Sequence, residues 1–314
     1  MLTFKKIELA DKTLLEPKLS ALNCKLMNYS FNVQFLYRDI IDFKFATYKN
    51  FIISKVTINQ EELFMFPVGE GDLNECLNMI KEYAFSKGDT IRFFQFCEKN
   101  GVLLNMWGEW LETTGDFWLH YMPAREQFEY VYFSEKLIKL EGQILKPKRN
   151  QINFFTKTFS WETQMINKEN IDEVRKFSYL WDEEKDIAAS SRLLLENIAL
   201  EEAFTHFFDI QLQGLLISVE NKIVAFSIGC PLNDDTYLIL FEKADRHYKG
   251  AYSMINREFA KIIAPKFQYI NRAEDGNIEG LRKAKLSYQP AVLNEVYFFT
   301  IKGYLKNTKA ESII

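Results

Sequence analysis

A chain of 314 residues exceeds the usual length of one domain, and 47% hydrophobic with 26% charged residues is the composition of a globular protein rather than a disordered chain. No apolar run reaches the roughly 18 residues that a membrane-spanning helix needs. Lys5, Lys6 and Glu8 fall where a signal peptide would be apolar. We therefore expect two domains, a cytoplasmic location and no transmembrane segment.

The histidines and cysteines are too few and too scattered to predict a metal site. None of them has a second histidine or cysteine at the spacing of zinc ligands, and there is no CxxC pair. We expect no metal, no tightly bound cofactor and free, buried thiols. The residues concerned are His120, His206, His247, Cys24, Cys76, Cys97 and Cys230.

The net charge of −4 hides a local excess of positive charge. The segment from Glu242 to Pro290 contains ten basic and six acidic residues, and a second basic group, Lys146, Lys148 and Arg149, precedes it. Two positive zones on an acidic protein favour a polyanionic ligand such as CoA or tRNA. The alternative is a solvated basic face without a ligand.

Strand and helix signals alternate in the first half. Phe51–Ile58 and Glu62–Val68 are rich in β-branched and aromatic residues and predict strands. Asp72 is a plausible N-cap of a helix that ends at Gly88, and Ile91–Cys97 predicts another strand. This order favours an α/β layered domain.

The second half begins after a crossover that we place at Gly115–Glu126, giving domains of residues 1–125 and 126–314. It opens with a short helix or turn at Ser134–Glu141, followed by the basic and aromatic segment Lys146–Thr158 and a helical stretch from Lys168 to Phe208. Three apolar runs then predict an antiparallel meander with turns between them: Gly214–Val219, Lys222–Pro231 and Thr236–Glu242.

A helix, a strand, a helix and a strand follow this meander. The helix Ala251–Ile263 carries an apolar stripe and is followed by Pro265. Next come the strand Phe267–Ile270, the helix Ile278–Leu286 and the final strand Glu295–Ile301.

Three antiparallel strands, a glycine-containing turn, a helix, a strand and a helix are the core order of the GNAT acyltransferase fold. The turn that ends in Tyr248, Lys249, Gly250 and Ala251 resembles the GNAT phosphate loop, in which backbone N–H groups at a helix N-terminus bind a pyrophosphate. It departs from that loop because Tyr252 stands where a second small residue is usual. Gly250 could instead be an ordinary turn residue.

The segment Asn277–Tyr288 resembles the late GNAT helix, which begins near an asparagine and ends near a tyrosine that can protonate the leaving group. Arg282 and Lys285 are three residues apart on one helical face and could hold one anion together. Lys283 lies on another face.

Four strings resemble the C-terminal domain family of phosphatidylglycerol lysyltransferases and its stand-alone relatives: LEGQILKPKRNQIN from Leu140, LILFEKAD from Leu238, YKGAYSMIN from Tyr248 and YINRAEDGNIEGLRKAKLSYQP from Tyr269. The resemblance covers Phe128–Ile301 and, more loosely, Asn28–Arg38. It implies an α/β (α+β) fold of two tandem GNAT-like acyltransferase domains, with mixed sheets flanked by helices and with Fem-type relatives. It also implies an aminoacyl group taken from charged tRNA.

The resemblance assigns site residues by position. The donor's phosphates would contact the basic segment Lys146, Lys148, Arg149 and Asn150, together with Tyr248, Lys249, Gly250, Ala251, Arg282 and Lys283. Catalysis would involve Glu242, Arg272, Asp275, Lys285 and Tyr288. Other site positions would be Asp245, Asn256, Asn271 and Glu274.

Transfer from an activated ester needs a base, an oxyanion stabiliser and an acid. We expect Glu242 or Asp275 as the base, Arg272 and Lys285 as the stabilising cations, and Tyr288 as the acid. The same residues could instead form ion pairs without catalysis, Glu242 with Lys285 and Asp275 with Arg272.

The loop after Asn271 departs from the family pattern, because Ala273 replaces an acidic residue and the glycine is displaced to Gly276. The membrane half of the lipid-modifying enzymes is also missing from this sequence, so the acceptor stays open among small molecules, peptides and lipids. We expect a transferase that uses a tRNA-linked or CoA-linked donor. A non-catalytic nucleic-acid-binding or regulatory module on a GNAT scaffold is the alternative, and an ordinary CoA-dependent acetyltransferase is a third reading.

Overall fold

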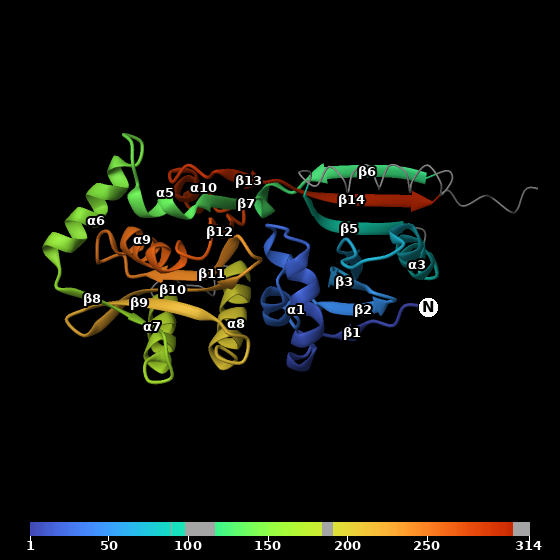
Figure 1. Cartoon of the computed structure of the whole chain (residues 1–314), viewed down its shortest axis with the longest axis horizontal. Helices are drawn as coiled ribbons and strands as arrows, with labels where there is room; N and C mark the ends of the chain where they lie inside the picture. The colour runs from blue at the N-terminus through green and yellow to red at the C-terminus, as the bar shows by residue number, and fades with distance from the viewer. Residues whose placement is uncertain (89, 98–116, 184–190, 304–314) are drawn as a thin grey trace, which may run out of the picture. The chain divides into compact units, whose positions relative to one another are not determined.

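The computed structural model describes residues 1–88, 90–97, 117–183 and 191–303, and the chain divides into two compact units (Figure 1). The first unit contains Met1–Ile7, Ile41–Arg125 and the segment that begins at Glu295; the second contains Glu8–Ile40 and Glu126–Asn294. One crossing lies at the expected boundary between residues 125 and 126. The units nevertheless exchange two segments relative to a continuous division. No helix of the described residues has both the length and the apolarity to cross a bilayer.

The first unit is a seven-stranded mixed sheet with one covering helix, α3 (Leu73–Phe85). Asp72 caps α3 as predicted, because its side chain accepts a hydrogen bond from the Glu75 N–H at 3.0 Å. The strand order is β1 (Lys5–Lys6), β2 (Lys44–Tyr48), β3 (Phe51–Ile58), β4 (Glu61–Phe64), β5 (Thr90–Cys97), β14 (Val296–Gly303) and β6 (Phe117–Pro123).

Two expectations for the sequence ends of this unit were wrong. Most of the supposed crossover Gly115–Glu126 is β6, and the final strand belongs to this sheet rather than to the second domain. The reason is that β14 hydrogen-bonds between β5 and β6, antiparallel to both. Pairing of strands this far apart in sequence leaves no local signal.

The second unit holds the other seven-stranded mixed sheet. Its order is β13 (Val292–Asn294), β7 (Glu129–Phe133), β12 (Tyr269–Glu274), β11 (Thr236–Ala244), β10 (Lys222–Pro231), β9 (Gln213–Val219) and β8 (Trp161–Met165). The antiparallel meander β9–β10–β11 is the one that the sequence predicted.

Helices cover both faces of this sheet. Helix α9 lies on the face opposite α7 and α8 (Figure 1), and it packs with α5 and α6 over a buried core that includes Phe155, Tyr237 and Phe259. The helices are α1 (Lys12–Ala21), α2 (Phe31–Leu36), α5 (Ser134–Lys139), α6 (Lys146–Thr158), α7 (Ile171–Glu183), α8 (Ser191–Thr205), α9 (Ala251–Ile263) and α10 (Glu279–Leu286), with short 3-10 helices at Leu9–Asp11, Met27–Tyr29 and Arg125–Gln127.

The parallel strands β11 and β12 separate soon after they begin. Their ladder contains three residue pairs and ends at Leu238 and Asn271. Beyond that point a bulge interrupts the pairing of β11 with β10, and a second irregularity follows Asn271 in β12. There Ala273 adopts a left-handed φ of 55°, and its N–H donates to Asn271 Oδ1 at 2.7 Å. The two bulges bend the strands apart and open a split in the sheet.

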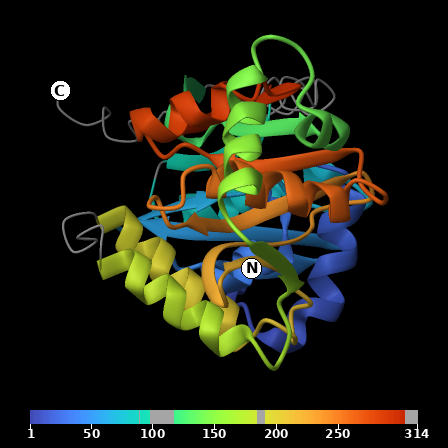
Figure 2. The same cartoon turned by 90° about the vertical axis from the view of Figure 1, so that its left-hand side faces the viewer.

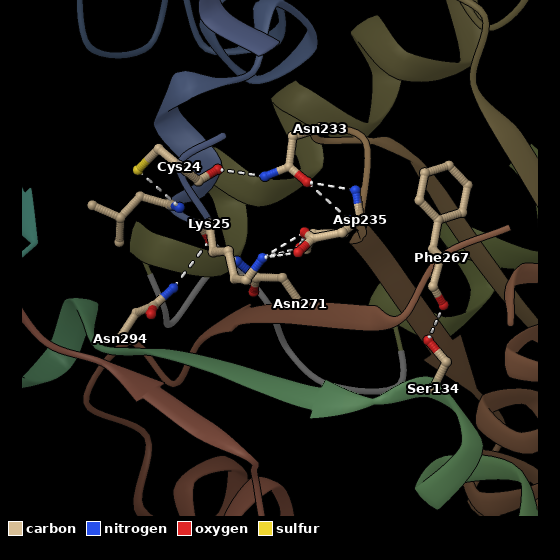
Figure 3. Close-up of polar contacts among 10 residues, drawn as sticks. Cys24, Lys25, Ser134, Asn233, Asp235, Phe267, Asn271 and Asn294 are labelled. Atoms are coloured by element: carbon tan, nitrogen blue, oxygen red, sulfur yellow. Dashed lines mark hydrogen bonds and ion pairs between the residues drawn. The ribbon is translucent and has the colours of Figure 1, made fainter. Parts of the chain in front are cut away.

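The segment before α2 is held against this sheet by polar contacts (Figure 3). The Lys25 carbonyl accepts hydrogen bonds from the side-chain amides of Asn271 at 2.7 Å and Asn294 at 3.1 Å. The Lys25 ammonium contacts both carboxylate oxygens of Asp235, and the Cys24 carbonyl accepts from Asn233. These bonds explain why Glu8–Ile40 belongs to the second unit.

Candidate active site

An ion pair bridges the split between β11 and β12. Arg272 Nη2 donates to Glu242 Oε1 at 2.7 Å, and the two side chains are only 12% and 11% exposed. After the bulge in β11, Glu242 points to the α9 face, where Ala244 also packs. The pair therefore occupies the place where the backbone ladder of the two strands has ended.

Each partner of this pair keeps a second polar atom without a hydrogen bond. Within the part of the chain that the structure describes, Glu242 Oε2 and Arg272 Nη1 are buried and have no partner. Leaving a charged group buried and unsatisfied costs free energy, so such atoms usually mark a functional site. One acceptor and one donor are thus available to a substrate in the split.

Two tyrosine rings form the wall beside Arg272. Its Cζ lies 5.1 Å from the centre of the Tyr288 ring and 5.8 Å from that of Tyr132. The Tyr288 hydroxyl donates to Ser253 Oγ at 3.2 Å, and Ser253 donates to Gln151 Oε1 at 2.6 Å. Burial raises the pKa of Tyr288, so its phenol stays protonated at neutral pH and is able to donate a proton.

Lys148 from α6 adds a second cation. Its Nζ lies 4.3 Å from the centre of the Tyr288 ring. Burial and, after it, the nearby charge of Arg272 lower the pKa of Lys148. The split therefore contains Arg272, Lys148 and one carboxylate, which favours a substrate or transition state that carries negative charge.

Lys285 is buried but serves the backbone. Its Nζ donates to the carbonyls of Arg272 at 2.6 Å and Glu274 at 2.5 Å, and so holds both sides of the β12 bulge. Burial lowers the pKa of Lys285 to about 8. The alternative pairing of Glu242 with Lys285 was wrong, because Arg272 turns toward β11 and takes Glu242.

Asp275 is also held by structure. It accepts two bonds from Arg282 at 2.9 Å, one from the Tyr130 hydroxyl at 2.6 Å and one from the Asn277 N–H at 2.9 Å. Burial alone would raise the pKa of Asp275, but the hydrogen bonds from Arg282 and Tyr130 outweigh it and keep that pKa well below its usual range. The expected pairing of Asp275 with Arg272 was wrong as well. Because its oxygens are engaged, Asp275 suits a structural role better than that of a base.

The loop that resembles a phosphate site packs against α6. Gly250 has a φ of +100°, and a Cβ there would lie 2.3 Å from the Gln151 carbonyl oxygen. The Ala251 N–H donates to the Tyr248 carbonyl at 2.9 Å. Helix α6 stands in front of α9 in Figure 2. Contact with α6 explains the glycine without a pyrophosphate.

The remaining predicted site residues are spread around this centre. Arg149 Nη1 donates to the carbonyls of Leu140 and Gly142 after α5. The side chain of Asp245 accepts from the His247 N–H at 2.8 Å, and Lys283 pairs with Glu279 on the surface. Asn256 is buried in α9 with its Oδ1 among the unpartnered atoms of the described residues. Residues that lie on the surface of α6 or its neighbouring loop are Lys146, Asn150 and Lys249.

Comparison with known proteins identifies the family. The sequence model of the family described as "Phosphatidylglycerol lysyltransferase, C-terminal" matches residues 22–300. The chain belongs to this family. The resemblance inferred from the four strings is thereby confirmed.

Relatives of this lysyltransferase-family chain include proteins without an assigned activity. An uncharacterized protein of Mycoplasmoides gallisepticum is 26% identical over 201 residues, which is 63% of this chain and 60% of that protein's length. A conserved protein of unknown function from Bacteroides thetaiotaomicron is 33% identical and superimposes with a TM-score of 0.89 over 96% of this chain and 100% of that one.

More distant structures show the fold. The C-terminal domain of a putative lysylphosphatidylglycerol synthetase from Agrobacterium fabrum superimposes with a TM-score of 0.64 at 12% identity, over 93% of this chain and 92% of that one. FemX gives 0.57 at 8% identity, over 94% and 96%. The expected fold class, two GNAT-like domains with mixed sheets flanked by helices, is confirmed.

The first unit of this family member has a comparable strand junction with different contents. Its parallel strands β4 and β5 share one pair, Phe64 with Phe93, whose ring centres lie 6.0 Å apart. Phe4 and Tyr83 pack on Phe64 at 6.0 Å each. Aromatic side chains fill the junction in the first unit, whereas an ion pair lies in the second.

Sequence reasoning missed several residues that line the site of this lysyltransferase-family chain. Tyr130 and Tyr132 alternate along β7 and both hydroxyls point to site residues or their backbone. Ser227 lies opposite Glu242 on β10, fully buried, with its Oγ among the unpartnered atoms of the described residues. The period-two pattern of Glu-Tyr-Val-Tyr-Phe predicts a strand, but which face meets β12 depends on long-range pairing.

Proposed function

We propose that this chain is an aminoacyltransferase that moves an aminoacyl group from tRNA to the nucleophile of an acceptor. The observation that carries the proposal is the buried Glu242–Arg272 pair with its two unpartnered atoms, in a chain of the lysyltransferase family. An ester on tRNA is already activated, so the enzyme has to position the reactants and stabilise the charge that develops.

The proposed roles follow from the available atoms. Glu242 Oε2 takes the proton of the attacking amine or hydroxyl, and Arg272 Nη1 stabilises the oxyanion that forms on the ester carbonyl. The new bond forms to the carbonyl carbon as the ester C–O bond breaks. Tyr288, whose pKa is raised by burial, gives its proton to the ribose oxygen that leaves and regains one through Ser253.

The donor is assigned to tRNA rather than CoA because of α6. In the loop that resembles a phosphate site, Gly250 contacts the Gln151 carbonyl and the Ala251 N–H is bonded to Tyr248. A pyrophosphate at this helix N-terminus would compete with these contacts. Helix α6 instead contributes basic residues, which suit a larger polyanion.

The test is discharge of a panel of radiolabelled aminoacyl-tRNAs, beginning with lysyl-tRNA, by the purified chain with a cell extract as the acceptor source. Transfer of label to a product should fall roughly 100-fold or more in Arg272→Gln, since one oxyanion donor contributes about that factor. Glu242→Gln should be similarly impaired, while Glu279→Gln, an exposed carboxylate, should match wild type.

Other results would favour other readings. Transfer from acetyl-CoA, without discharge of any tRNA, would point to an ordinary acetyltransferase. Binding of tRNA with a steep salt dependence, but no discharge and no effect of Glu242→Gln, would favour a non-catalytic RNA-binding module.

A further inference from the structure

The outer face of α6 carries a stripe that none of the site contacts uses. Lys146, Asn150, Phe154 and Lys157 are all exposed and recur at intervals of four, four and three residues, so they lie along one side of the helix. The helix contains no acidic residue. We name these four residues, together with Lys249, the α6 stripe.

Phe154 is the unusual member of the stripe. Its side chain is 41% exposed, whereas the adjacent Phe155 is fully buried in the core. Lys249, from the loop before α9, places its Nζ 5.0 Å from the centre of the Phe154 ring. An exposed aromatic ring with a cation at its face, between two further lysines, offers both stacking and phosphate contacts.

The inner face of the same helix reaches the candidate active site. Lys148 lies over Tyr288, and Gln151 accepts the hydrogen bond of Ser253. Lys146 is two residues from Lys148, so the N-terminal end of the stripe adjoins the site. A chain bound along the stripe would deliver its end to the split between β11 and β12.

We propose that the α6 stripe binds the single-stranded 3′ end of an RNA, with a base stacked on Phe154 and phosphates on Lys146, Lys157 and Lys249. The proposal rests on the proposed function and adds the place where the donor is held. Single strands suit this surface because stacking on one exposed ring needs an unpaired base, whereas a duplex presents its bases edge-on.

The experiment uses the full chain and two fluorescent RNA hairpins with the same acceptor-type stem, one ending in single-stranded CCA and one blunt. Fluorescence anisotropy at several salt concentrations should show tighter binding of the CCA hairpin. Phe154→Ala should weaken this binding roughly tenfold, in line with the loss of one base stack, while Phe154→Tyr should retain it. Lys146→Gln with Lys157→Gln should reduce the slope of log affinity against log salt by about one to two.

Lys283→Gln, an exposed lysine of α10 that is 74% exposed, is the matched control and should bind as wild type does. Since the replaced side chains are exposed, melting temperatures should not change. Equal binding of both hairpins, or wild-type binding by Phe154→Ala, would overturn the proposal. If these variants still transfer an aminoacyl group normally, the stripe is refuted and the proposed function stands.

Two further results are distinguishable. If the chain neither binds the hairpins nor discharges any aminoacyl-tRNA, the proposed function itself fails. Vesicles containing phosphatidylglycerol provide the remaining comparison. Vesicle binding that Phe154→Ala abolishes, with RNA binding unchanged, would assign the stripe to a lipid surface and reject the RNA.

Discussion

Glu129 on β7 is a carboxyl group with no exposed surface. Both of its oxygens accept from the Met27 N–H, at 3.1 and 3.0 Å, and Oε2 also accepts from the Asn271 side chain. Burial raises the pKa of Glu129 to about 8. The folded chain therefore binds a proton at neutral pH that the unfolded chain releases near pH 4.5.

This linkage predicts a pH-dependent stability. Because the folded pKa is raised, the stability from Glu129 is complete below about pH 4.5 and is lost progressively as pH rises to about 8. Urea unfolding at pH 6, 7 and 8 should show that Glu129→Gln gains on wild type by up to about 1.4 kcal/mol per pH unit. Glu279→Gln should follow the wild-type profile, and parallel profiles for Glu129→Gln would contradict the assignment.

The choice of Glu242 over Asp275 also belongs to the residue scale. Sequence spacing placed both carboxylates near the end of β11 and after β12 but could not tell which one would be saturated. That difference arises from the bulge at Ala273, which turns Arg272 toward Glu242, and from Tyr130, which reaches Asp275 from another strand. Both are long-range contacts without a local pattern.

At the scale of elements, local signals were sufficient where a helix or hairpin is self-contained. Helix α9 runs from Ala251 to Ile263 as predicted, and the three strands before it form the predicted meander. Strand β12 begins and ends later than expected, at Tyr269–Glu274 rather than Phe267–Ile270. Its polar second half resembles a loop in sequence, and pairing with β7 makes it a strand.

Packing of α6 on α9 predicts the effect of a methyl group at Gly250. Gly250→Ala would combine a φ of +100° with a contact of 2.3 Å to the Gln151 carbonyl, so the free energy of unfolding should fall by about 1 to 3 kcal/mol. Gly280 in α10 has no atom within 4 Å of the corresponding position. Gly280→Ala should therefore stabilise the chain by up to about 1 kcal/mol. Chemical denaturation of both variants measures the contrast, and equal effects would reject the role given to Gly250.

At the scale of the whole molecule, each unit repeats a sheet with a parallel strand pair, and the contents of the two junctions differ. Phe64 and Phe93 close the junction in the first unit, whereas Glu242 and Arg272 bridge it in the second. The division of the chain into two similar folds could be anticipated from the repeated order of strands and helices. The exchange of Glu8–Ile40 and β14 could not, because it depends on partners more than a hundred residues away.

This exchange predicts that residues Glu126–Asn294 do not fold alone. Without Glu8–Ile40, the buried carboxyl of Glu129 loses the Met27 N–H, the Asn271 and Asn294 amides lose the Lys25 carbonyl, and Leu238 loses its contact with Val33. Buried polar groups left unpaired are costly. The fragment should show no cooperative thermal transition by circular dichroism.

Addition of a peptide spanning Glu8–Ile40 should restore that transition. A Met27→Pro peptide is the matched control, because Met27 is the first residue of a 3-10 helix, where proline fits the backbone but removes the N–H that Glu129 accepts. We expect this peptide to restore folding at a lower melting temperature, since one bond to a buried group is missing. Cooperative unfolding of the fragment by itself would show that these contacts are dispensable, and equal melting temperatures with the two peptides would remove the role of Met27.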